Sequence, residues 1–562
     1  MTCTRALAAC TAALSFLLAA PVAPAGGTES AQLALVGLAT VPSPTAPVVA
    51  ALDALGLDVT PLTHIPAAVV RGTPTQLAAA GALAGVTSVE PDRPLELYLD
   101  KTVPLIRADS VRDELGIDGT GVTVAVVDSG IDATHPDLAY GSKVVENVKI
   151  LGEEHYAPGI SLAVPGVVDT DTTSGHGTHV AGIVAGDGTA SGGRYRGVAP
   201  GARLVGVGSG EAVSMVTAAV GLDWVVAHRD QYGIEVVNNS WGDGTVPYDP
   251  NDVLNRATKA VHDAGITVVM AAGNDGSYGA GHISRYCIPD WVVCVGASTK
   301  TGALADLSSR GDPVDATWWP DVLAPGMYVA SARASTGLYS DTNSAPVDLT
   351  DPANPAVMPT DYWARYMVLS GTSMAAPHIA GVAALLLEAN PRLTPDAVRE
   401  VLRRTARPVA GCQPYACGNG LVDARAAVDL VRGVHNVKKL TRSDGSTYWA
   451  AEQVTTWTGT VGASLFGTAH DAHTVTVPAG ATSLDATITW ANGLADLDLA
   501  LVRPDGSTAV SAVNSITQLP NGAKAETAST ASPAAGTWRV DASGFASVST
   551  PYTGTASTYT PL

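Results

Sequence analysis

Short apolar runs alternate with longer helical stretches between residues 122 and 272, and this alternation limits the possible folds more than any other feature. The apolar runs lie at 122–127, 203–207, 234–238 and 266–272. The helical stretches lie at 178–185, 212–228 and 250–264, and two more follow at 373–388 and 394–405. Strands that alternate with helices predict an α/β fold, in which a parallel central sheet carries helices on both faces.

Two regions with different sequence patterns flank this predicted domain. Residues 26–100 combine apolar stretches with a helical stretch at 75–83, entered through Thr73-Pro74, which predicts a small α+β unit. Residues 450–562 contain short alternating segments between Gly, Pro, Asn and Asp turns, which predicts an all-β sandwich. We therefore expect the α/β domain at 101–435 and a polar linker at 436–449.

The first residues indicate export. Arg5 supplies a positive charge, residues 6–20 form an apolar run too short to span a bilayer, and Ala23-Pro24-Ala25 offers small residues for a signal peptidase. We expect a cleaved signal peptide at 1–25, with an uncleaved anchor as the alternative. A lipoprotein is disfavoured because neither Cys3 nor Cys10 follows the apolar run. No later segment is expected to span a membrane, so the mature chain is predicted to be secreted and extracellular.

The charge and the remaining cysteines fit an exported protein. The chain carries 52 acidic and 32 basic residues, a net charge of -20, which argues against nucleic acid as a partner. The four cysteines outside the signal allow three pairings. The most economical one joins Cys287 to Cys294 and Cys412 to Cys417 as disulfides. Zinc is the rival interpretation, but neither pair has the close spacing of a zinc knuckle and no histidine cluster completes four ligands.

Four motifs carry polar residues at positions where parallel sheets build sites. Asp128 ends the apolar run 124–127, and Asn274 follows the run 268–272. His176 lies between two glycines just before a helix, where a neutral imidazole can act as a general base. Ser373 stands at the mouth of a long apolar helix, where the helix dipole favours developing negative charge. Each residue alone has a plain alternative, as a cap, turn or loop residue.

Together these residues follow the order Asp, His, Ser, which is the order found in subtilisin. Residues 105 to about 430 resemble the subtilisin-like (subtilase) serine peptidases. The matching motifs are Asp128-Ser129-Gly130, the segment 176–182, the segment 271–274 and the long, specific segment 371–377. The resemblance implies Asp128 as orienting acid, His176 as base, Ser373 as nucleophile and Asn274 as oxyanion donor. His179 and His378 are interpreted as structural. Sedolisins are disfavoured because they carry Glu and Asp where this chain has His176 and Asn274.

The same resemblance suggests the substrate-binding segments and raises the question of calcium. Ser240, Trp241 and Gly242 resemble the segment that pairs with the substrate backbone as an added strand. The opposite side of the cleft is expected to contain Gly208, Ser209 and Gly210. Asp137 resembles a family calcium ligand, but the loop 186–193 does not match the one that supplies the other ligands in calcium-bound relatives. No cofactor is expected to be required, and calcium remains an option that this loop does not support.

Both flanking units also resemble parts of subtilase precursors. Residues 26–100 are similar to the propeptide, an intramolecular chaperone and inhibitor. Residues 86–92 resemble its last strand, and the tail at 95–100 would lie in the cleft as the product of its own cleavage. The C-terminal unit resembles the β-sandwich domains appended to secreted bacterial peptidases, from the local segments 494–499, 503–506 and 536–538.

We therefore expect a monomeric serine endopeptidase that acts on extended protein or peptide substrates, matures itself and is inhibited by its own propeptide. Its partners should include neither nucleic acid nor, after signal cleavage, a membrane. An inactive subtilase-like binding protein is the first alternative, and it is disfavoured because all four catalytic positions are filled. A surface adhesion module is the second, and it is disfavoured because no anchor or sorting-type tail is evident.

Overall fold

A computed structural model covers the chain and describes most of its residues. These are 30–40, 43, 46–61, 67–91, 99–152, 161–210, 213–244, 247–337, 358–442, 444–512, 517–519 and 522–562. The predicted signal peptide and residues 95–98 of the predicted propeptide tail lie outside them. The chain forms two compact units, residues 1–95 and 96–562.

The first unit is a small α+β fold, as the sequence predicts. Its sheet has the order β2-β3-β1-β4 and is antiparallel. The strands are β1 (Gln32–Leu38), β2 (Asp58–Pro61), β3 (Ala67–Gly72) and β4 (Val86–Pro91), and the helices are α1 (Pro47–Ala54) and α2 (Pro74–Ala80). Thr73 and Gln76 form a reciprocal capping box at the start of α2, which explains why that helix begins where it does.

An eight-stranded sheet forms the centre of the second unit, in the order β12-β11-β10-β9-β5-β8-β6-β7. Its strands are β5 (Thr123–Asp128), β6 (Val144–Ile150), β7 (Ala163–Val164), β8 (Arg203–Gly208), β9 (Ile234–Asn239), β10 (Thr267–Ala271), β11 (Val292–Ser298) and β12 (Val322–Pro325). All neighbouring pairs are parallel except β6 and β7. The sheet is therefore mixed at one edge, where the sequence analysis expected only parallel strands.

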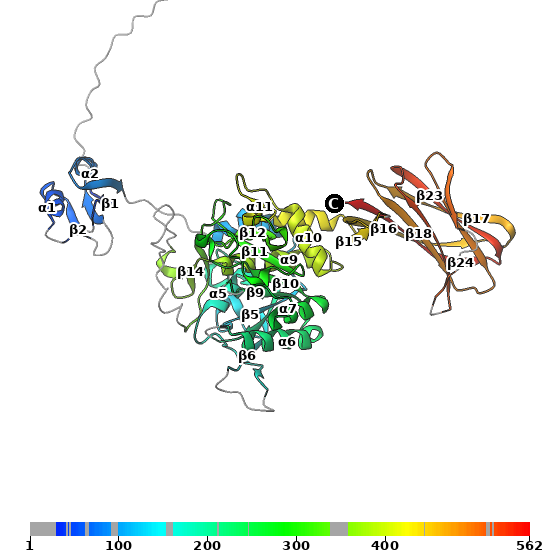
Figure 1. The fold of residues 1–562 in the computed structure, drawn as a ribbon, viewed down its shortest axis with the longest axis horizontal. Helices are drawn as coiled ribbons and strands as arrows, with labels where there is room; N and C mark the ends of the chain where they lie inside the picture. Colours follow the sequence, from blue (N-terminus) through cyan, green and yellow to red (C-terminus); the bar gives the residue numbers. More distant parts are fainter. Residues whose placement is uncertain are drawn as a thin grey trace, which may run out of the picture. The chain divides into compact units, whose positions relative to one another are not determined.

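Helices cover both faces of this sheet (Figure 1). They are α3 (Leu99–Leu105), α4 (Ala108–Leu115), α5 (His176–Ala185), α6 (Met215–Tyr232), α7 (Val253–Asp263), α9 (Thr372–Ala389), α10 (Pro395–Thr405), α11 (Pro414–Cys417) and α12 (Ala424–Arg432). Along β5, Val124 and Val126 join the core shared with α5 and α9, whereas Ala125 and Val127 join the core shared with α6 and α7. A strand with both faces buried must be apolar throughout, which explains the continuous run that predicted it.

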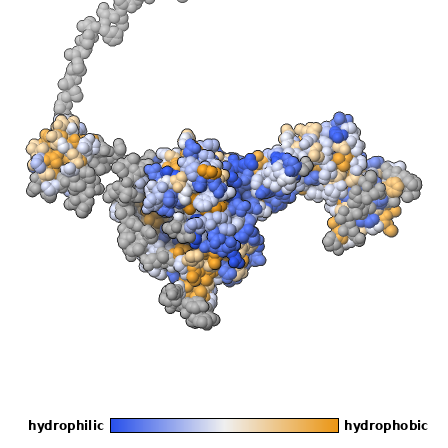
Figure 2. Space-filling model, viewed as in Figure 1, coloured by the Kyte–Doolittle hydropathy of each residue, from blue (hydrophilic) through white to orange (hydrophobic). Residues whose placement is uncertain are grey.

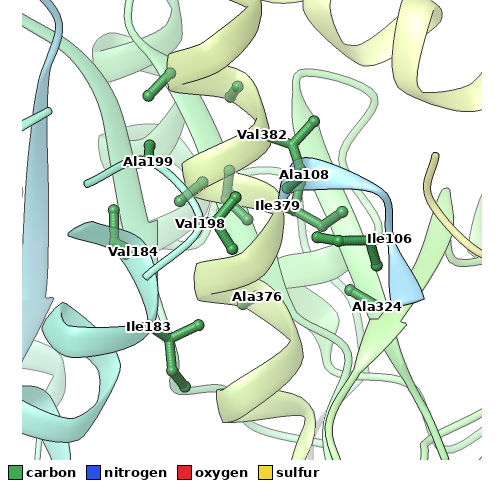
Figure 3. Packing of buried hydrophobic residues seen from close by; sticks show 14 of the residues in the cluster. Ile106, Ala108, Ile183, Val184, Val198, Ala199, Ala324, Ala376, Ile379 and Val382 are labelled. Atoms are coloured by element: carbon green, nitrogen blue, oxygen red, sulfur yellow. The ribbon is translucent and has the colours of Figure 1, made fainter. Parts of the chain in front are cut away.

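Helix α9 lies at the centre of the larger core. Figure 3 shows Ala376, Ile379 and Val382 of α9 among Ile183 and Val184 of α5 and residues of neighbouring segments. Among the described residues, α9 is the one helix long and apolar enough to cross a membrane, which the sequence analysis did not expect of any later segment. Most of it is buried inside the protein, so its apolar character is explained by its place in the core.

The β6–β7 edge and the antiparallel ribbon opposite it complete this domain. Figure 2 shows hydrophobic residues near the end of the domain where β6 and β7 lie, and Val164 and Val168 are exposed there. The ribbon pairs β13 (Val329–Ala332) with β14 (Tyr366–Leu369) and leads directly into α9. Because β14 ends at Leu369, shortly before α9 begins at Thr372, the pairing of the ribbon fixes where the first turn of α9 lies.

The C-terminal region is all β, as predicted. One sheet has the order β15-β16-β24-β18-β22-β21 and the other β17-β23-β19-β20. The strands are β15 (Asn436–Thr441), β16 (Thr447–Val461), β17 (Ser464–Val477), β18 (Ser483–Trp490), β19 (Asp496–Val502), β20 (Thr508–Ala512), β21 (Thr517–Gln518), β22 (Lys524–Ala531), β23 (Gly536–Ser547) and β24 (Thr550–Pro561). Residues from both sheets share one core that includes Trp490 and Trp538.

The stretch expected to be a linker has regular structure. Residues 436–441 form β15, which pairs antiparallel with the start of β16. Lys438 forms an ion pair with Glu452 across these strands. The side chain of Asn390, at the end of α9, donates to the carbonyl oxygens of Val434 and His435 just before β15. Polar composition suggested a linker here, but pairing with a long neighbouring strand satisfies the backbone of this segment instead.

Candidate active site

Asp128 and His176 meet at the carboxyl edge of the central sheet. Asp128 is the last residue of β5 and is 2% exposed, and His176 is the first residue of α5 and is 20% exposed. The Nδ1 atom of His176 lies 2.7 Å from Oδ1 of Asp128. A side chain at Gly177 would lie 2.2 Å from the carbonyl oxygen of Gly130, so only glycine permits this close approach of helix and strand.

The electrostatics favour a protonated Nδ1 and a basic imidazole. Burial alone would lower the pKa of His176, but the charge and hydrogen bond of Asp128, with a further contribution from Asp171, raise this pKa above its ordinary value. Because Nδ1 must carry the proton that it donates to Asp128, Nε2 is the ring atom that can accept a proton. This tautomer is the one that a general base requires.

Ser373 lies at the start of α9, one residue after the helix begins at Thr372. Its Oγ donates to the carbonyl oxygen of Ser240 at 2.9 Å, and the Oγ of Ser240 donates to the carbonyl oxygen of Ser373, also at 2.9 Å. Ser240 follows β9, the strand next to β5. The adjacent Trp241 donates from Nε1 to the carbonyl oxygen of Val127 at 3.0 Å, which joins this segment to the end of β5.

Asn274 completes the same edge of the sheet, three residues after the end of β10. Its Oδ1 accepts hydrogen bonds from the backbone N–H of Thr372 at 2.9 Å and from the hydroxyl of Thr372 at 3.0 Å. The Thr372 hydroxyl in turn accepts from the N–H of Gly273. These contacts fix the orientation of the amide, so that Nδ2 is its donating end beside the start of α9.

The structure adds one acidic residue that the sequence analysis missed. Asp171 is fully buried and binds the backbone on both sides of His176, at Gly175 and Thr178. The available signal was an acidic residue shortly before the His motif, in Asp169-Thr170-Asp171. That pattern alone does not distinguish a buried anchor from a surface loop, because the partners of Asp171 include Ser129, 42 residues earlier.

The two other histidines of these motifs have structural contacts, as interpreted. His179 is buried, and its Nε2 lies within hydrogen-bond distance of the carbonyl oxygens of Val329 and Met367. Burial lowers the pKa of His179 to about 3. His378 is also buried, with Nδ1 2.8 Å from the carbonyl oxygen of Met374, and burial lowers its pKa to about 4. Both rings therefore stay neutral in the working pH range of the fold.

The predicted substrate-binding segments lie next to this site. Residues 240–244 follow β9 without forming a strand, and Gly242 has room for no side chain because one would lie 2.4 Å from the Oγ of Ser284. On the other side, Gly208 ends β8 opposite Asp128, and the N–H of Ser209 donates to the carbonyl oxygen of Asp128 at 2.7 Å. Gly210 is half-buried with a positive φ of 89°. Their binding of substrate stays a prediction.

Asp137 does not fit a calcium site well, because both of its carboxylate oxygens already accept hydrogen bonds from protein donors. Its Oδ1 accepts from the N–H of Ala190 and its Oδ2 from the hydroxyl of Tyr366, each at 2.7 Å. A calcium ion at this carboxylate would have to displace protein donors from a buried side chain. No group of three or more His, Cys, Asp or Glu residues suited to a metal occurs in the part of the chain that the structure describes.

Both expected cysteine pairs are bonded in the structure. Cys287 is joined to Cys294 across a Cα–Cα distance of 5.0 Å, and Cys412 to Cys417 across 6.2 Å. The first bond ties the segment before β11 to the strand itself, and the second closes the loop around α11. Neither pair lies in the catalytic site.

The sequence and this geometry agree with known proteins. Residues 119–444 match the Subtilase family, and residues 470–544 match the bacterial pre-peptidase C-terminal domain. The first match covers more than half of the chain, so this chain belongs to the subtilase family of serine peptidases, hydrolases that act on peptide bonds.

The chain is similar to several individual proteins. The chain is 33% identical over 356 residues to serine protease AprX of Bacillus subtilis (strain 168), which covers 60% of this chain and 73% of AprX. It is also 33% identical over 335 residues to subtilisin DY of Bacillus licheniformis, with 58% of this chain and 97% of that protein covered. The solved structure of Sphericase is 26% identical, covers 54% of this chain and 92% of its own, and has a TM-score of 0.43.

Proposed function

We propose that this subtilase is a secreted serine endopeptidase in which Asp128, His176 and Ser373 form the catalytic triad. The observation that carries the proposal is the 2.7 Å contact between Asp128 and His176 at the same sheet edge that holds Ser373 against Ser240. The strands β5, β9 and β10 are neighbours, and their carboxyl ends bring together residues that lie up to 245 positions apart in the sequence, from Asp128 to Ser373. Sites of this kind form where parallel strands end.

The reaction follows from the protonation states of these groups. As the Oγ of Ser373 attacks the scissile carbonyl carbon, its proton passes to Nε2 of His176 and a tetrahedral oxyanion forms. The imidazolium then gives that proton to the leaving amine, and the C–N bond breaks to leave an acyl ester on Ser373. Water hydrolyses the ester by the same route. Asp128 stabilises the imidazolium and holds Nδ1–H in place.

Asn274 and the start of α9 are proposed to stabilise the oxyanion. The Nδ2 of Asn274 is oriented by the two hydrogen bonds that Oδ1 accepts from Thr372. The backbone N–H of Ser373 lies in the first turn of α9, where N–H groups have no partner within the helix. Donors that are fixed before the charge develops stabilise the transition state more than the ground state.

Extended peptides are the proposed substrates. Residues 240–242 follow β9 outside regular structure, so their main chain can pair with a peptide by strand addition. Main-chain pairing is indifferent to side chains, which favours broad selectivity. Casein hydrolysis by the purified mature protein, abolished by a serine-directed phosphonate but not by a metal chelator, is the expected result. Hydrolysis that resists the phosphonate would contradict a serine mechanism.

We further propose that residues 26–100 fold the enzyme and then inhibit it before the mature protein acts outside the cell. This unit has its own sheet and two helices, but its core contains mostly Ala, Val and Leu residues from a short segment. A unit of this size is only marginally stable alone, and docking on the catalytic domain would supply further burial. The tail, residues 95–100, would lie as an added strand beside residues 240–242. In the structure Leu99 begins α3, so a product-like tail requires unwinding at that point.

The precursor proposal is tested by expressing residues 101–562 with and without the separate segment 26–100. Active enzyme should accumulate only when the segment is present, and the segment added to mature enzyme should inhibit it competitively. A segment truncated after residue 91 is the matched control, because it keeps β4 but lacks the tail, and it should assist folding while inhibiting weakly. Equal yields without the segment would contradict the chaperone role.

A further inference from the structure

The buried carboxylate of Asp171 accepts four hydrogen bonds at and beside the start of α5. Its Oδ2 accepts from the N–H of Thr178 at 2.9 Å and from the hydroxyl of the same residue at 2.6 Å. Its Oδ1 accepts from the N–H of Gly175 and from the Oγ of Ser129, each at 2.8 Å. All four partners are donors, so the carboxylate form of Asp171 satisfies every contact without a proton.

These contacts surround His176 on both sides. Gly175 precedes the histidine and Thr178 follows it by two positions, and both backbone N–H groups end on the same carboxylate. The first N–H groups of a helix lack partners within the helix and are stabilised by a negative charge. Asp171 therefore performs the work of an N-cap for α5, whose own N-cap residue, Gly175, has no side chain.

Ser129 links this acid to the triad acid. Its backbone N–H donates to Oδ1 of Asp128 at 2.7 Å, and its hydroxyl donates to Asp171. The same hydroxyl accepts from the N–H of Gly177 at 2.8 Å. One serine thus contacts the orienting acid, the second acid and the residue after the histidine.

We propose that Asp171 is a positioning residue for the catalytic histidine, which fixes the start of α5 and places a second negative charge next to the imidazole. The inference rests on the triad proposed above. Proton transfer from Ser373 creates a positive charge on His176, and a fixed carboxylate nearby stabilises that charge without having to reorganise. Ser129 transmits the same constraint to Asp128.

The charged groups around this pair set the pH at which the effect is measured. His176 faces Asp128 from β5 and Asp171 from its own segment, and His179 lies one turn along α5. Asp171 is surrounded by Asp169, Lys149 of β6 and, beyond Asp169, Asp132. The pKa of Asp171 lies above its ordinary value, because burial raises it by more than its hydrogen bonds lower it. Lys149 supplies a compensating positive charge and donates to the carbonyl oxygen of Thr170.

The test compares Asp171→Asn with Thr178→Val in the mature enzyme, with a peptide anilide substrate assayed from acid to alkaline pH. Asp171→Asn should lower kcat about tenfold, the effect of losing one charge-assisted hydrogen bond, with little change in KM. Because the negative charge is removed, the acid limb of kcat/KM should move to lower pH. Thr178→Val removes a hydroxyl contact but keeps the charge, so it should lower thermal stability without moving that limb.

An acid limb in Asp171→Asn that coincides with the wild-type limb would overturn the proposal. If Asp171→Asn does not accumulate as mature enzyme, Ser129→Ala tests the same constraint, because it removes the hydroxyl link and keeps both carboxylates. Ser129→Ala should lower kcat without shifting the acid limb, and an unchanged kcat would contradict the role of the link. Phosphonate labelling of wild-type Ser373 separates these results from a failure of the triad itself, which would leave the wild type unlabelled.

Discussion

Two strands of this molecule, β5 in the α/β domain and β18 in the C-terminal sandwich, bury their residues in opposite ways. All six residues of β5 are buried, whereas buried and partly exposed residues alternate strictly along the eight residues of β18. A central parallel strand has helices on both faces, and a sandwich strand has the core on one face only. The same residue type therefore indicates a different environment in each strand.

Aspartate illustrates the difference. Asp485 occupies a partly exposed position in β18 and needs no further explanation, because that face of the sheet meets water. Asp128 is 2% exposed at the end of a strand with no solvent face, so its carboxylate needs fixed partners, and it has them in His176 and Ser129. Burying a charge is costly unless it is paired, and in this fold the partner is the histidine that we propose as the catalytic base.

The largest expected effect is at Ser373. Replacing Ser373 by alanine should lower turnover about 10⁶-fold, the loss known from a subtilisin, and should leave the precursor unprocessed. Ser370→Ala, just before the same motif, is the matched control. The Oγ of Ser370 accepts from the N–H of Tyr328, and its loss should spare activity. Precursor size by mass spectrometry and peptide hydrolysis rates measure both effects. Processing of the Ser373→Ala protein to mature size without added protease would exclude self-maturation.

A smaller loss is expected at Asn274. Asn274→Ala should lower kcat roughly 10²- to 10³-fold with a smaller change in KM, because the amide meets charge that exists mainly in the transition state. Asn274→Asp keeps an oxygen that can accept from Thr372 but replaces the Nδ2 donor with a carboxylate oxygen. Its negative charge would oppose the oxyanion, so this variant should show at least a similar loss. Steady-state kinetics at saturating substrate provide the measurement. Full turnover in either variant would remove Asn274 from the mechanism.

The stability of the C-terminal sandwich should depend on which face of β18 carries a carboxylate. Ala486 is 1% exposed, and Ala486→Asp should destabilise this domain by about 3 kcal/mol because it buries an unpaired carboxylate. Asp485→Ala, one position earlier on the other face, should change stability by less than about 0.5 kcal/mol. Urea unfolding of the phosphonate-inactivated enzyme measures both. Equal changes in stability for the two variants would contradict the claim that only one face of β18 is buried.

Asp169 provides a pH-dependent prediction in the α/β domain. Burial and then the charge of Asp132 raise the pKa of Asp169 to about 6 from 3.8. A raised carboxyl pKa means that folding stability is highest when this group is protonated, and that stability falls as the pH rises from about 4 through about 6. Asp169→Asn removes the penalty, and its Oδ1 can still accept from the N–H of Asp171.

The gain from Asp169→Asn should be roughly 1 to 3 kcal/mol at pH 8, with allowance for the partial exposure of the group, and much smaller at pH 4. The free energy of unfolding of the phosphonate-inactivated enzyme at the two pH values measures it. The same gain at both pH values would show that the effect does not come from ionisation of Asp169.

The local sequence pattern was sufficient to predict much of the secondary structure of this protein. The apolar run before Asp128 predicts β5 because a strand buried on both faces has no position for polar residues until it ends. The short alternating segments of residues 450–562 predict strands with one buried face, and β18 has this alternation of burial. The long motif around Ser373 predicts the helix α9, which begins at Thr372.

Features set by distant partners were not predictable. Asp171 is explained by Ser129, and the contacts of Asp137 by Tyr366, 229 residues later in the chain. The polar stretch 436–441 forms a strand because β16 is available to pair with it. β7 pairs antiparallel with β6 at the edge of the central sheet, where the alternation of strand and helix does not continue. In each case the structure of the segment depends on a partner that lies outside the stretch of sequence used for the prediction.

The central claim, that Ser373 is the nucleophile activated by His176, is tested most directly by locating the adduct of a serine-directed phosphonate. Peptide mapping of the labelled mature enzyme should place a single adduct on the Oγ of Ser373, formed at a rate that falls with the protonation of His176 and is lost in His176→Ala. Labelling of another serine with loss of activity, or rapid labelling of Ser373 in His176→Ala, would contradict the account.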